Sequence, residues 1–481
     1  HDDITVTAWW PYTAGETTPP AVVVKADQSA RKNFEGSDLI VAEEQTVSYG
    51  NPTLRFTHRT ARVTVVLTDY TEGLASVRLT GLSTEGGNPA EIAPYDKGGD
   101  TYTALVAPQT VAAGTAFITC AFNNGKVFVY KMKNDAEWKA GEEYTYTVSL
   151  AAAKDPGYTV SENGRTYEVY NAEGLKNLAK LVNEEGKTDI DITLTGDITL
   201  TGEWTPIGTE SQPYTGTFDG GGKYTITGLK IDQSGTDYVG LIGRLGSGGK
   251  VQDVTLTEVN VTGGTYVGGI AGQNDGTVEN CSVNGTVTGR GFNDTGGIVG
   301  TNYGTISGCS AEGTVTGSVN VGGIAGGSYL GVTIVGCYSS AAVEGYSTVG
   351  GVVGNLGNNS SLMASYSTGN VTVTSTTGYA GGVVGVNAQG TVTACYHATG
   401  TVSGQGNVGG IVGMNNSGQN TACYWSSNPA NGIGKMDSGT NGTIKVDGDW
   451  QNAVTQMNTA LQNAGSEWRY ELTGELPTLK K

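Results

Sequence analysis

Cysteine has the widest chemistry in this sequence, because its side chain can form disulfides, bind metals or act as a nucleophile. The six cysteines are Cys120, Cys281, Cys309, Cys337, Cys395 and Cys423. From Cys281 onward they lie 28, 28, 58 and 28 residues apart, and Ser365 falls near the middle of the long gap. The last five cysteines therefore mark one position of a repeat.

Stacked strands place such residues poorly for disulfide formation. Equivalent residues on neighbouring parallel strands lie ~4.8 Å apart, whereas the Cβ atoms of a disulfide lie ~3.5–4.5 Å apart. No Cys-X-X-Cys pair or Cys/His cluster accompanies the cysteines, so zinc-type binding is not indicated either. We expect a ladder of free, buried thiols. Cys120 alternates in phase with Ile118 and Phe122 and is expected to be a core residue.

An aromatic series follows the cysteine positions by one residue. It comprises Tyr338, Tyr366, Tyr396 and Tyr424, with Trp425 directly after the last. If the ladder residue points inward, its successor points outward, so the tyrosines should form an exposed column. One interpretation is that the rings stack on one another and stabilise the sheet. The other is that these four tyrosines, together with Trp425, bind a ligand on a neutral aromatic face suited to sugars or a partner protein.

Acid–base catalysis has few candidate residues. Histidine occurs three times, at His1, His58 and His397. Between residues 295 and 434 the only charged residues are Glu312 and Glu344. Polysaccharide lyases and hydrolases need clustered acidic residues, so this composition opposes an enzyme. We predict no catalytic residues, no cofactor and no metal site.

The remaining polar candidates have structural interpretations. His397 stands alone and is expected at the surface or at a corner. Asp219 lies in a Phe-Asp-Gly-Gly-Gly segment and suits a turn. Asn274 and Asp275 are turn residues that could contact calcium, but the nonapeptide calcium repeat is absent. The Gly-Gly pairs are not a phosphate-binding loop, because no Gly-Lys-Ser/Thr follows them.

Composition excludes several classes of protein. Glycine accounts for 77 of 481 residues without a Gly-X-Y period, which excludes collagen. The net charge of −18 has the wrong sign for binding nucleic acid. No apolar run is long enough for a transmembrane helix. The sequence starts at His1 without a signal-peptide pattern, which fits a processed or truncated secreted protein.

A repeat of about 28 residues decides the predicted fold. Seven copies of a Gly-Gly-apolar-apolar-Gly segment, or of its close variant, begin at Gly240, Gly268, Gly296, Gly322, Gly350, Gly381 and Gly409. A unit of three short strands cannot bury its apolar residues alone, but stacked units bury a continuous column of Ile, Val, Ala and Cys side chains. The pattern predicts a right-handed parallel β-helix. A β-propeller is the alternative, although a unit of this length is short for a four-stranded blade.

The predicted chain is all-β, with a β-sandwich over residues 1–152 ahead of the β-helix. Antiparallel strands are expected over 4–10, 54–58, 61–65 and 144–148. Asn124-Gly125 between two alternating segments predicts a hairpin.

Residues 153–158 are expected to be a linker, and residues 159–430 the β-helix. Helical spacing predicts a capping helix near 172–184, and a C-terminal cap is expected over 431–481, with Asp449 as the N-cap of a helix.

Two family resemblances follow from these segments. Trp204-Thr205-Pro206-Ile207-Gly208, Gly216-Thr217-Phe218-Asp219-Gly220 and the Val-Gly-Gly-Ile-Ala-Gly series resemble the GLUG repeat of bacterial surface adhesins, over about 159–430. Residues 1–152 resemble the fimbrillin-type pilins of Bacteroides. The matching segments are Ala8-Trp9-Trp10-Pro11-Tyr12, Asp27-Gln28-Ser29, Ser37-Asp38-Leu39, Leu54-Arg55-Phe56-Thr57-His58, Ala104-Leu105-Val106-Ala107-Pro108-Gln109 and Trp138-Lys139-Ala140-Gly141-Glu142-Glu143-Tyr144. Family members carry further strands upstream of the Trp-Pro-Tyr segment, whereas this sequence begins a few residues before it.

The resemblances imply a non-enzymatic adhesin or structural subunit that binds through the face or edge of its β-helix. They imply a secreted protein of the cell surface or fimbria of a Gram-negative bacterium, associated with the outer membrane. Its partners would be other pilin subunits or surface proteins, with host or dietary glycans as candidate ligands, and no nucleic acid. The alternative is a carbohydrate-active β-helix enzyme, either a polysaccharide lyase or a glycoside hydrolase.

Overall fold

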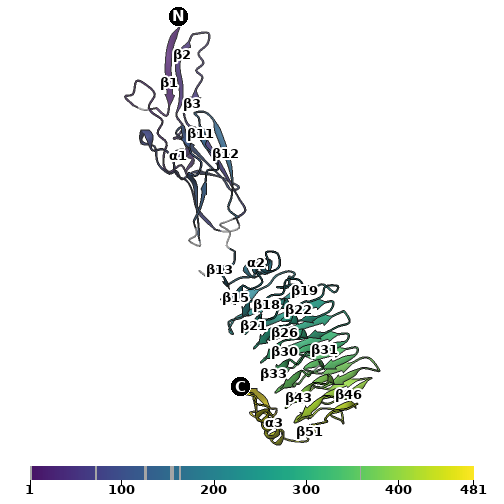
Figure 1. Ribbon diagram of the computed structural model, residues 1–481. Helices are drawn as coiled ribbons and strands as arrows, with labels where there is room; N and C mark the ends of the chain where they lie inside the picture. Colours follow the sequence, from purple (N-terminus) through teal and green to yellow (C-terminus); the bar gives the residue numbers. More distant parts are fainter. Residues whose placement is uncertain are drawn as a thin grey trace. The chain divides into compact units, whose positions relative to one another are not determined.

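The computed structural model describes residues 3–12, 14–70, 73–123, 127–151, 156–161, 164–357 and 359–481. The chain divides into two compact units, His1–Asp155 and Pro156–Lys481. Both consist mainly of strands (Figure 1). The predicted turn at Asn124-Gly125 and residues 153–155 of the predicted linker lie outside the described residues.

The N-terminal unit is sandwich-like. Its strands are β1 (Ile4–Trp10), β2 (Ile40–Val47), β3 (Thr57–His58), β4 (Ala61–Thr68), β5 (Leu74–Leu79), β6 (Tyr95–Gly98), β7 (Thr101–Val106), β8 (Gln109–Val111), β9 (Ala116–Phe122), β10 (Val127–Lys131), β11 (Ala136–Trp138) and β12 (Glu143–Ser149), with short helices α1 (Arg31–Glu35) and η1 (Glu85–Gly87). The sheet β12-β4-β7-β6 packs on the sheet β10-β9-β5. Phe117 from β9 meets Tyr146 from β12 with ring centroids 4.9 Å apart. Cys120 is fully buried in this core, as predicted.

One pairing in this unit differs from the expected antiparallel arrangement. β12 runs parallel to β4, with Tyr144 opposite Val63. A parallel pair needs a long crossover connection, and the strands between β4 and β12 supply it.

The second unit is a parallel β-solenoid whose turns stack in register (Figure 1). One turn consists of β25 (Thr277–Glu279), β26 (Ser282–Gly289), β27 (Thr295–Gly296) and β28 (Val299–Asn302). Each turn therefore contributes four strands here, where the sequence predicted three. The additional strand is short because it ends within the Gly-Gly pair, where the chain bends, and it pairs with its own equivalents on neighbouring turns.

The two glycines of each pair are required for different reasons. A Cβ on Gly322 would lie 1.9 Å from the carbonyl oxygen of Ala325, so the bend leaves no room for a side chain. A Cβ on Gly323 would lie 2.2 Å from the carbonyl oxygen of Gly351 on the next turn and 2.2 Å from Oγ of Ser339, an inward-facing residue of the opposite sheet. The first glycine makes the bend, and the second makes space for the core.

The cysteine ladder is present inside the solenoid. All six cysteines of the chain are buried and free. The backbone N–H of Cys281 donates to Sγ of Cys309, and that of Cys309 donates to Sγ of Cys337, both over 3.4 Å. Ser365 occupies the next position, where its Oγ accepts from the N–H of Cys337 at 3.2 Å. The predicted common phase of these residues is confirmed.

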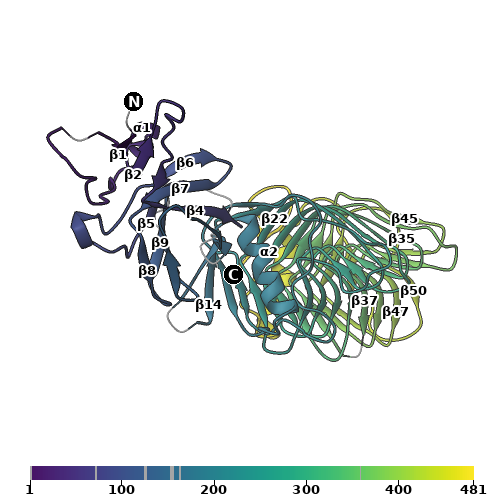
Figure 2. The same ribbon diagram turned by 90° about the horizontal axis from the view of Figure 1, so that it is seen from above.

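Helix α2 (Ala172–Asn183) covers the first turns, where helical spacing predicted a helix (Figure 2). Oδ1 of Asn171 accepts from the N–H of Gly174 over 2.8 Å and so caps the helix N-terminus. Leu175, Leu178 and Val182 are fully buried in the solenoid core. The apolar face of α2 thereby closes this end of the solenoid.

The segment predicted as the C-terminal cap, residues 431–481, consists of two parts. β50 (Ile433–Met436) and β51 (Thr443–Lys445) extend the sheets as the last turn. Helix α3 (Gln451–Asn463) and the hairpin of β52 (Arg469–Glu471) and β53 (Thr478–Lys480) then fold back along the side of the solenoid (Figure 1). The reason is that the apolar face of α3 finds a column of aromatic rings on that side. The N-cap residue of α3 is Trp450 and not the predicted Asp449, which lies one residue earlier and accepts from the N–H of Gln451 over 2.9 Å.

Candidate functional site

The predicted tyrosine column is present on the outer surface of the solenoid. Tyr338, Tyr366, Tyr396 and Tyr424 are opposite one another on β34 (Tyr338–Ser339), β39 (Tyr366–Ser367), β44 (Tyr396–His397) and β49 (Cys423–Trp425). The ring centroids of Tyr338 and Tyr366 lie 5.1 Å apart, with an interplanar angle of 8°. The rings thus stack along the solenoid axis, as the stabilising interpretation requires.

The expectation that this column is exposed is wrong for half of it. Tyr338 is 40% exposed, but Tyr396 is 1% exposed and Tyr424 is 3% exposed. Trp450 and Tyr470 of the C-terminal segment contact the ring of Tyr396 at centroid distances of 5.0 and 5.7 Å. The hydroxyl of Tyr396 donates to the carbonyl oxygen of Pro477 over 2.6 Å. Burial also raises the pKa of Tyr366 to about 12.

Trp425 and His397 lie inside the solenoid, which corrects both expectations. They follow Tyr424 and Tyr396 directly, so strand alternation turns them to the opposite face. Trp425 packs over Gly410, where an added Cβ would lie 2.3 Å from its ring. His397 is fully buried over Gly382, and burial lowers its pKa to about 4. Neither residue can contact a ligand at the surface.

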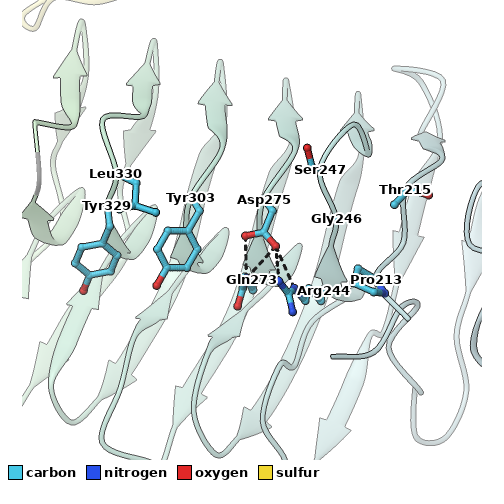
Figure 3. Close-up of a pocket in the computed structure, with 10 residues that line it drawn as sticks. All are labelled: Pro213, Thr215, Arg244, Gly246, Ser247, Gln273, Asp275, Tyr303, Tyr329 and Leu330. Carbon is cyan, nitrogen blue, oxygen red and sulfur yellow. Dashed lines mark hydrogen bonds and ion pairs between the residues drawn. The ribbon is translucent and has the colours of Figure 1, made fainter. Parts of the chain in front are cut away.

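A different face carries a groove that the sequence analysis did not identify (Figure 3). It follows β20 (Ile242–Leu245), β24 (Ala271–Asn274), β28 and β32 (Ala325–Ser328), which pair in this order. Its lining residues are Pro213, Thr215, Arg244, Gly246, Ser247, Gln273, Asp275, Tyr303, Tyr329 and Leu330. Asp275, Tyr303 and Tyr329 each come directly after one of these strands. The sequence did carry a signal for this groove. In successive repeats, the residue that lines it directly follows a Gly-X-Asn or Gly-X-Ser segment.

Buried amides fix the corner that carries these residues. Asn274 donates from Nδ2 to Oδ1 of Asn302 over 2.7 Å, and Asn302 donates to Oγ of Ser328 over 3.1 Å. Oδ1 of Asn274 also accepts from the N–H of Gly276. All three side chains face inward, so the residue that follows each of them faces the groove.

An ion pair occupies one part of the groove (Figure 3). Nε and Nη2 of Arg244 donate to Oδ2 of Asp275 over 3.0 and 2.9 Å. Nε2 of Gln273 donates to both carboxylate oxygens, over 2.8 and 3.0 Å. Both charged side chains are partly buried, with exposures of 29% and 20%. These contacts hold Asp275 as a fixed, neutralised acceptor.

Aromatic side chains occupy the other part. The rings of Tyr303 and Tyr329 lie 5.9 Å apart at 38°, and Tyr303 is 36% exposed. The hydroxyl of Tyr329 donates to Oδ1 of Asp294 over 3.3 Å, and Nδ2 of Asn320 donates to the same oxygen over 2.7 Å. Burial raises the pKa of the Asp294 carboxyl, although these hydrogen bonds oppose the rise. Asp294 therefore anchors Tyr329 from behind the groove.

The other polar candidates have structural roles. Oδ1 of Asp219 accepts from the N–H of Gly221 over 2.7 Å, as a turn-forming aspartate does. Within the described ranges, no group of three His, Cys, Asp or Glu side chains is arranged to hold a metal ion. None of the helices in the described part of the chain is long and apolar enough to cross a bilayer.

Two family models match the chain. Residues 1–165 match the fimbrillin-like family, and residues 263–288 and 293–316 match the GLUG motif. The N-terminal region is fimbrillin-like. The GLUG match lies within the solenoid and covers fewer turns than the resemblance over 159–430 suggested. The fimbrillin-like region supports a role as a surface adhesin or structural protein.

Individual relatives either match only part of this chain or match it with low sequence identity and a low TM-score. Halomucin of Haloquadratum walsbyi is 30% identical over 214 residues, which are 40% of this chain and only 2% of that protein. A candidate immunoglobulin A1 protease of Bacteroides ovatus covers 67% of this chain and 94% of its own, at 18% identity and a TM-score of 0.45. A fimbrial protein of Bacteroides ovatus covers 33% and 39%, at 17% identity and a TM-score of 0.22. Similarities at this level carry no argument about activity.

Proposed function

We propose that this protein is a non-enzymatic adhesin of the bacterial cell surface, associated with a pilus, whose solenoid groove binds the ligand. The fimbrillin-like region supports the surface location and partners among pilin subunits or other surface proteins. The groove carries the binding part of the proposal. It combines a fixed ion pair with exposed aromatic and aliphatic side chains on a stacked, rigid framework.

The groove favours binding over acid–base catalysis. Asp275 is the only acidic residue among its lining residues, and both of its oxygens already accept hydrogen bonds from Gln273. The nearby Asp294 is mostly enclosed behind Tyr329 and hydrogen-bonded there. Glycoside hydrolysis needs two carboxyl groups that face the substrate, and lyases need a free base. These side chains suit a fixed binding surface.

An adhesion assay tests the proposal. Beads coated with the purified protein are applied to epithelial cells and mucin, using wild type and the double variant Asp275→Asn with Tyr303→Ala. We expect the double variant to lose adhesion by at least about tenfold, because two contacts at the centre of the site are removed. Tyr346→Ala is the matched control, since this tyrosine is 61% exposed away from the groove. Unchanged adhesion of the double variant would reject the groove as the binding surface.

The enzyme alternative is tested separately. The protein is incubated with plant and host polysaccharides. It is also incubated with immunoglobulin A1, because one of the solved structures compared above is named as a protease of that antibody. We expect no new reducing ends, no unsaturated products and no proteolytic fragments. Turnover that is lost in Asp275→Asn would replace the adhesin proposal with an enzyme.

A further inference from the structure

The groove is electrically neutral where a ligand would lie. Arg244 and Asp275 are its only charged lining residues, and they pair with each other. A charged ligand would have to break this pair or bind beside it without a counter-charge, and both options are costly for partly buried groups. An uncharged ligand with many hydroxyl groups meets no such opposition. Such a ligand can bond to the remaining N–H groups of the Arg244 guanidinium, to the remaining lone pairs of the Asp275 carboxylate and to Oε1 of Gln273, whose Nε2 already donates to Asp275.

The aromatic part of the groove offers apolar surface beside these polar groups. Tyr303 and Tyr329 lie side by side on neighbouring turns, and Figure 3 shows both rings in one row with Asp275. Leu330, which is 69% exposed, extends the apolar surface. A flat face of C–H groups can pack on such rings while hydroxyl groups at its edge bond to neighbouring polar atoms. Sugars combine both features in each unit.

The spacing of the groove also fits a chain of sugars. Arg244, Asp275, Tyr303 and Tyr329 come from successive turns of the solenoid. Parallel strands repeat every ~4.8 Å, about the length of one pyranose unit, so these residues span ~14 Å. We propose that the groove binds an uncharged oligosaccharide of about three to four units that lies along the solenoid axis. This inference rests on the proposed function, because it names the ligand of the same groove.

An extended peptide fits the groove less well. Peptides that bind sheets usually add a strand at an open edge. The strands β24, β28 and β32 lie inside one sheet and pair on both sides, and β20, the first strand of that sheet, is bridged on its outer side by Ile207 and Tyr214. A peptide could therefore contact only side chains in the groove and would form no backbone hydrogen bonds with the sheet. A sugar does not need such backbone bonds, because it binds through side chains. Peptide binding is one outcome of the test below.

The test uses the full-length protein on an array of neutral, sialylated and sulfated glycans, followed by calorimetry with the strongest neutral oligosaccharide. We expect neutral glycans to bind, with a Kd that changes little between low and high salt. Tyr303→Ala should weaken binding by at least about tenfold, because it removes the central aromatic surface. Tyr346→Ala should bind as wild type. Tyr338→Ala, on the accessible end of the tyrosine column, tests that column in the same assay.

Two results would overturn the inference. Binding only to sialylated or sulfated glycans would show a charged ligand, and binding only to protein that has been stripped of glycans would show a peptide ligand. Periodate treatment of the target cells separates this inference from the adhesin proposal. If adhesion depends on the groove but survives periodate, the sugar inference fails and the adhesin proposal stands. If adhesion never depends on the groove, the binding part of the proposed function fails, together with the inference.

Discussion

Tyr366 and Tyr396 stack almost in parallel, with ring centroids 4.6 Å apart and an interplanar angle of 6°. On one side of this pair, Tyr338 stacks on Tyr366. On the other side, Trp450 and Tyr470 contact the ring of Tyr396. The tyrosine column therefore serves as the docking surface for the C-terminal segment. Of the five residues proposed as a ligand site, Tyr338 is 40% exposed and Tyr366 is half-buried, whereas the other three are buried.

Removing contacts at Tyr470 should detach this segment. The hydroxyl of Tyr470 donates to the carbonyl oxygen of Ala394 over 2.9 Å and the ring is buried. Tyr470→Phe should lower the free energy of unfolding by about 1–2 kcal/mol through the lost hydrogen bond. Tyr470→Ala should lower it by about 3–5 kcal/mol through the cavity. Tryptophan fluorescence during urea unfolding measures the change, because Trp450 and Trp468 lie in this segment.

The control for this series is Tyr346→Phe, whose ring is 61% exposed. Equal stability of Tyr470→Ala and wild type would contradict docking of the segment on the column.

The thiol ladder should resist alkylation in the native protein. Cys281, Cys309, Cys337, Cys395 and Cys423 are buried, and burial raises the pKa of Cys423 to about 11. Alkylating reagents need an accessible thiolate, so these residues should react only after denaturation. Mass spectrometry after iodoacetamide treatment, with and without guanidinium chloride, measures this. A disulfide between any two of them would show that the ladder geometry is wrong.

His397 should make the solenoid less stable in mild acid. Its Nε2 donates to the carbonyl oxygen of Gly400 over 2.9 Å, and burial lowers its pKa from 6.5 to about 4. Between these values the unfolded chain binds the proton and the folded protein does not, so stability falls as pH decreases from about 6.5 to 4. The shift corresponds to a loss of ~3 kcal/mol once the pH is below both values.

Unfolding curves at pH 7, 5.5 and 4 for wild type and His397→Asn isolate this contribution from the carboxylates. The variant removes the titrating group, so the difference between the two proteins should shrink or reverse toward low pH. A difference that does not change with pH would contradict the assignment.

The first glycine of each pair should tolerate no side chain. A Cβ on Gly381 would lie 1.9 Å from the carbonyl oxygen of Val384, which is a backbone atom held in the sheet. Gly381→Ala should cost at least about 3 kcal/mol and give mostly insoluble protein. Gly235→Ala is the matched control, because nothing lies within 4 Å of its added Cβ. Soluble expression and circular dichroism compare the two, and equal yields of folded protein would contradict the steric argument.

The repeat in the sequence was enough to predict the solenoid and the phase of its turns. Each turn places equivalent residues on the same ladder, so a spacing of 28 residues between Cys281, Cys309 and Cys337 is enough to stack them. Alternation along a strand then puts Cys395 inside and Tyr396 on the other face. The fimbrillin-like and GLUG segments were likewise visible in the sequence because they are local patterns.

What each outer face of the solenoid contacts could not be predicted from the repeat, because it depends on the packing of the whole chain. Tyr396 is buried because residues 450–481, which are no part of the repeat, fold back over it, and no periodicity encodes that contact. The groove likewise depends on the ion pair between Arg244 and Asp275, which are 31 residues apart and belong to different turns. Periodicity predicts which way a side chain points, because that direction depends on the local backbone. Contacts between different turns, and contacts with segments outside the repeat, depend on how the whole chain packs.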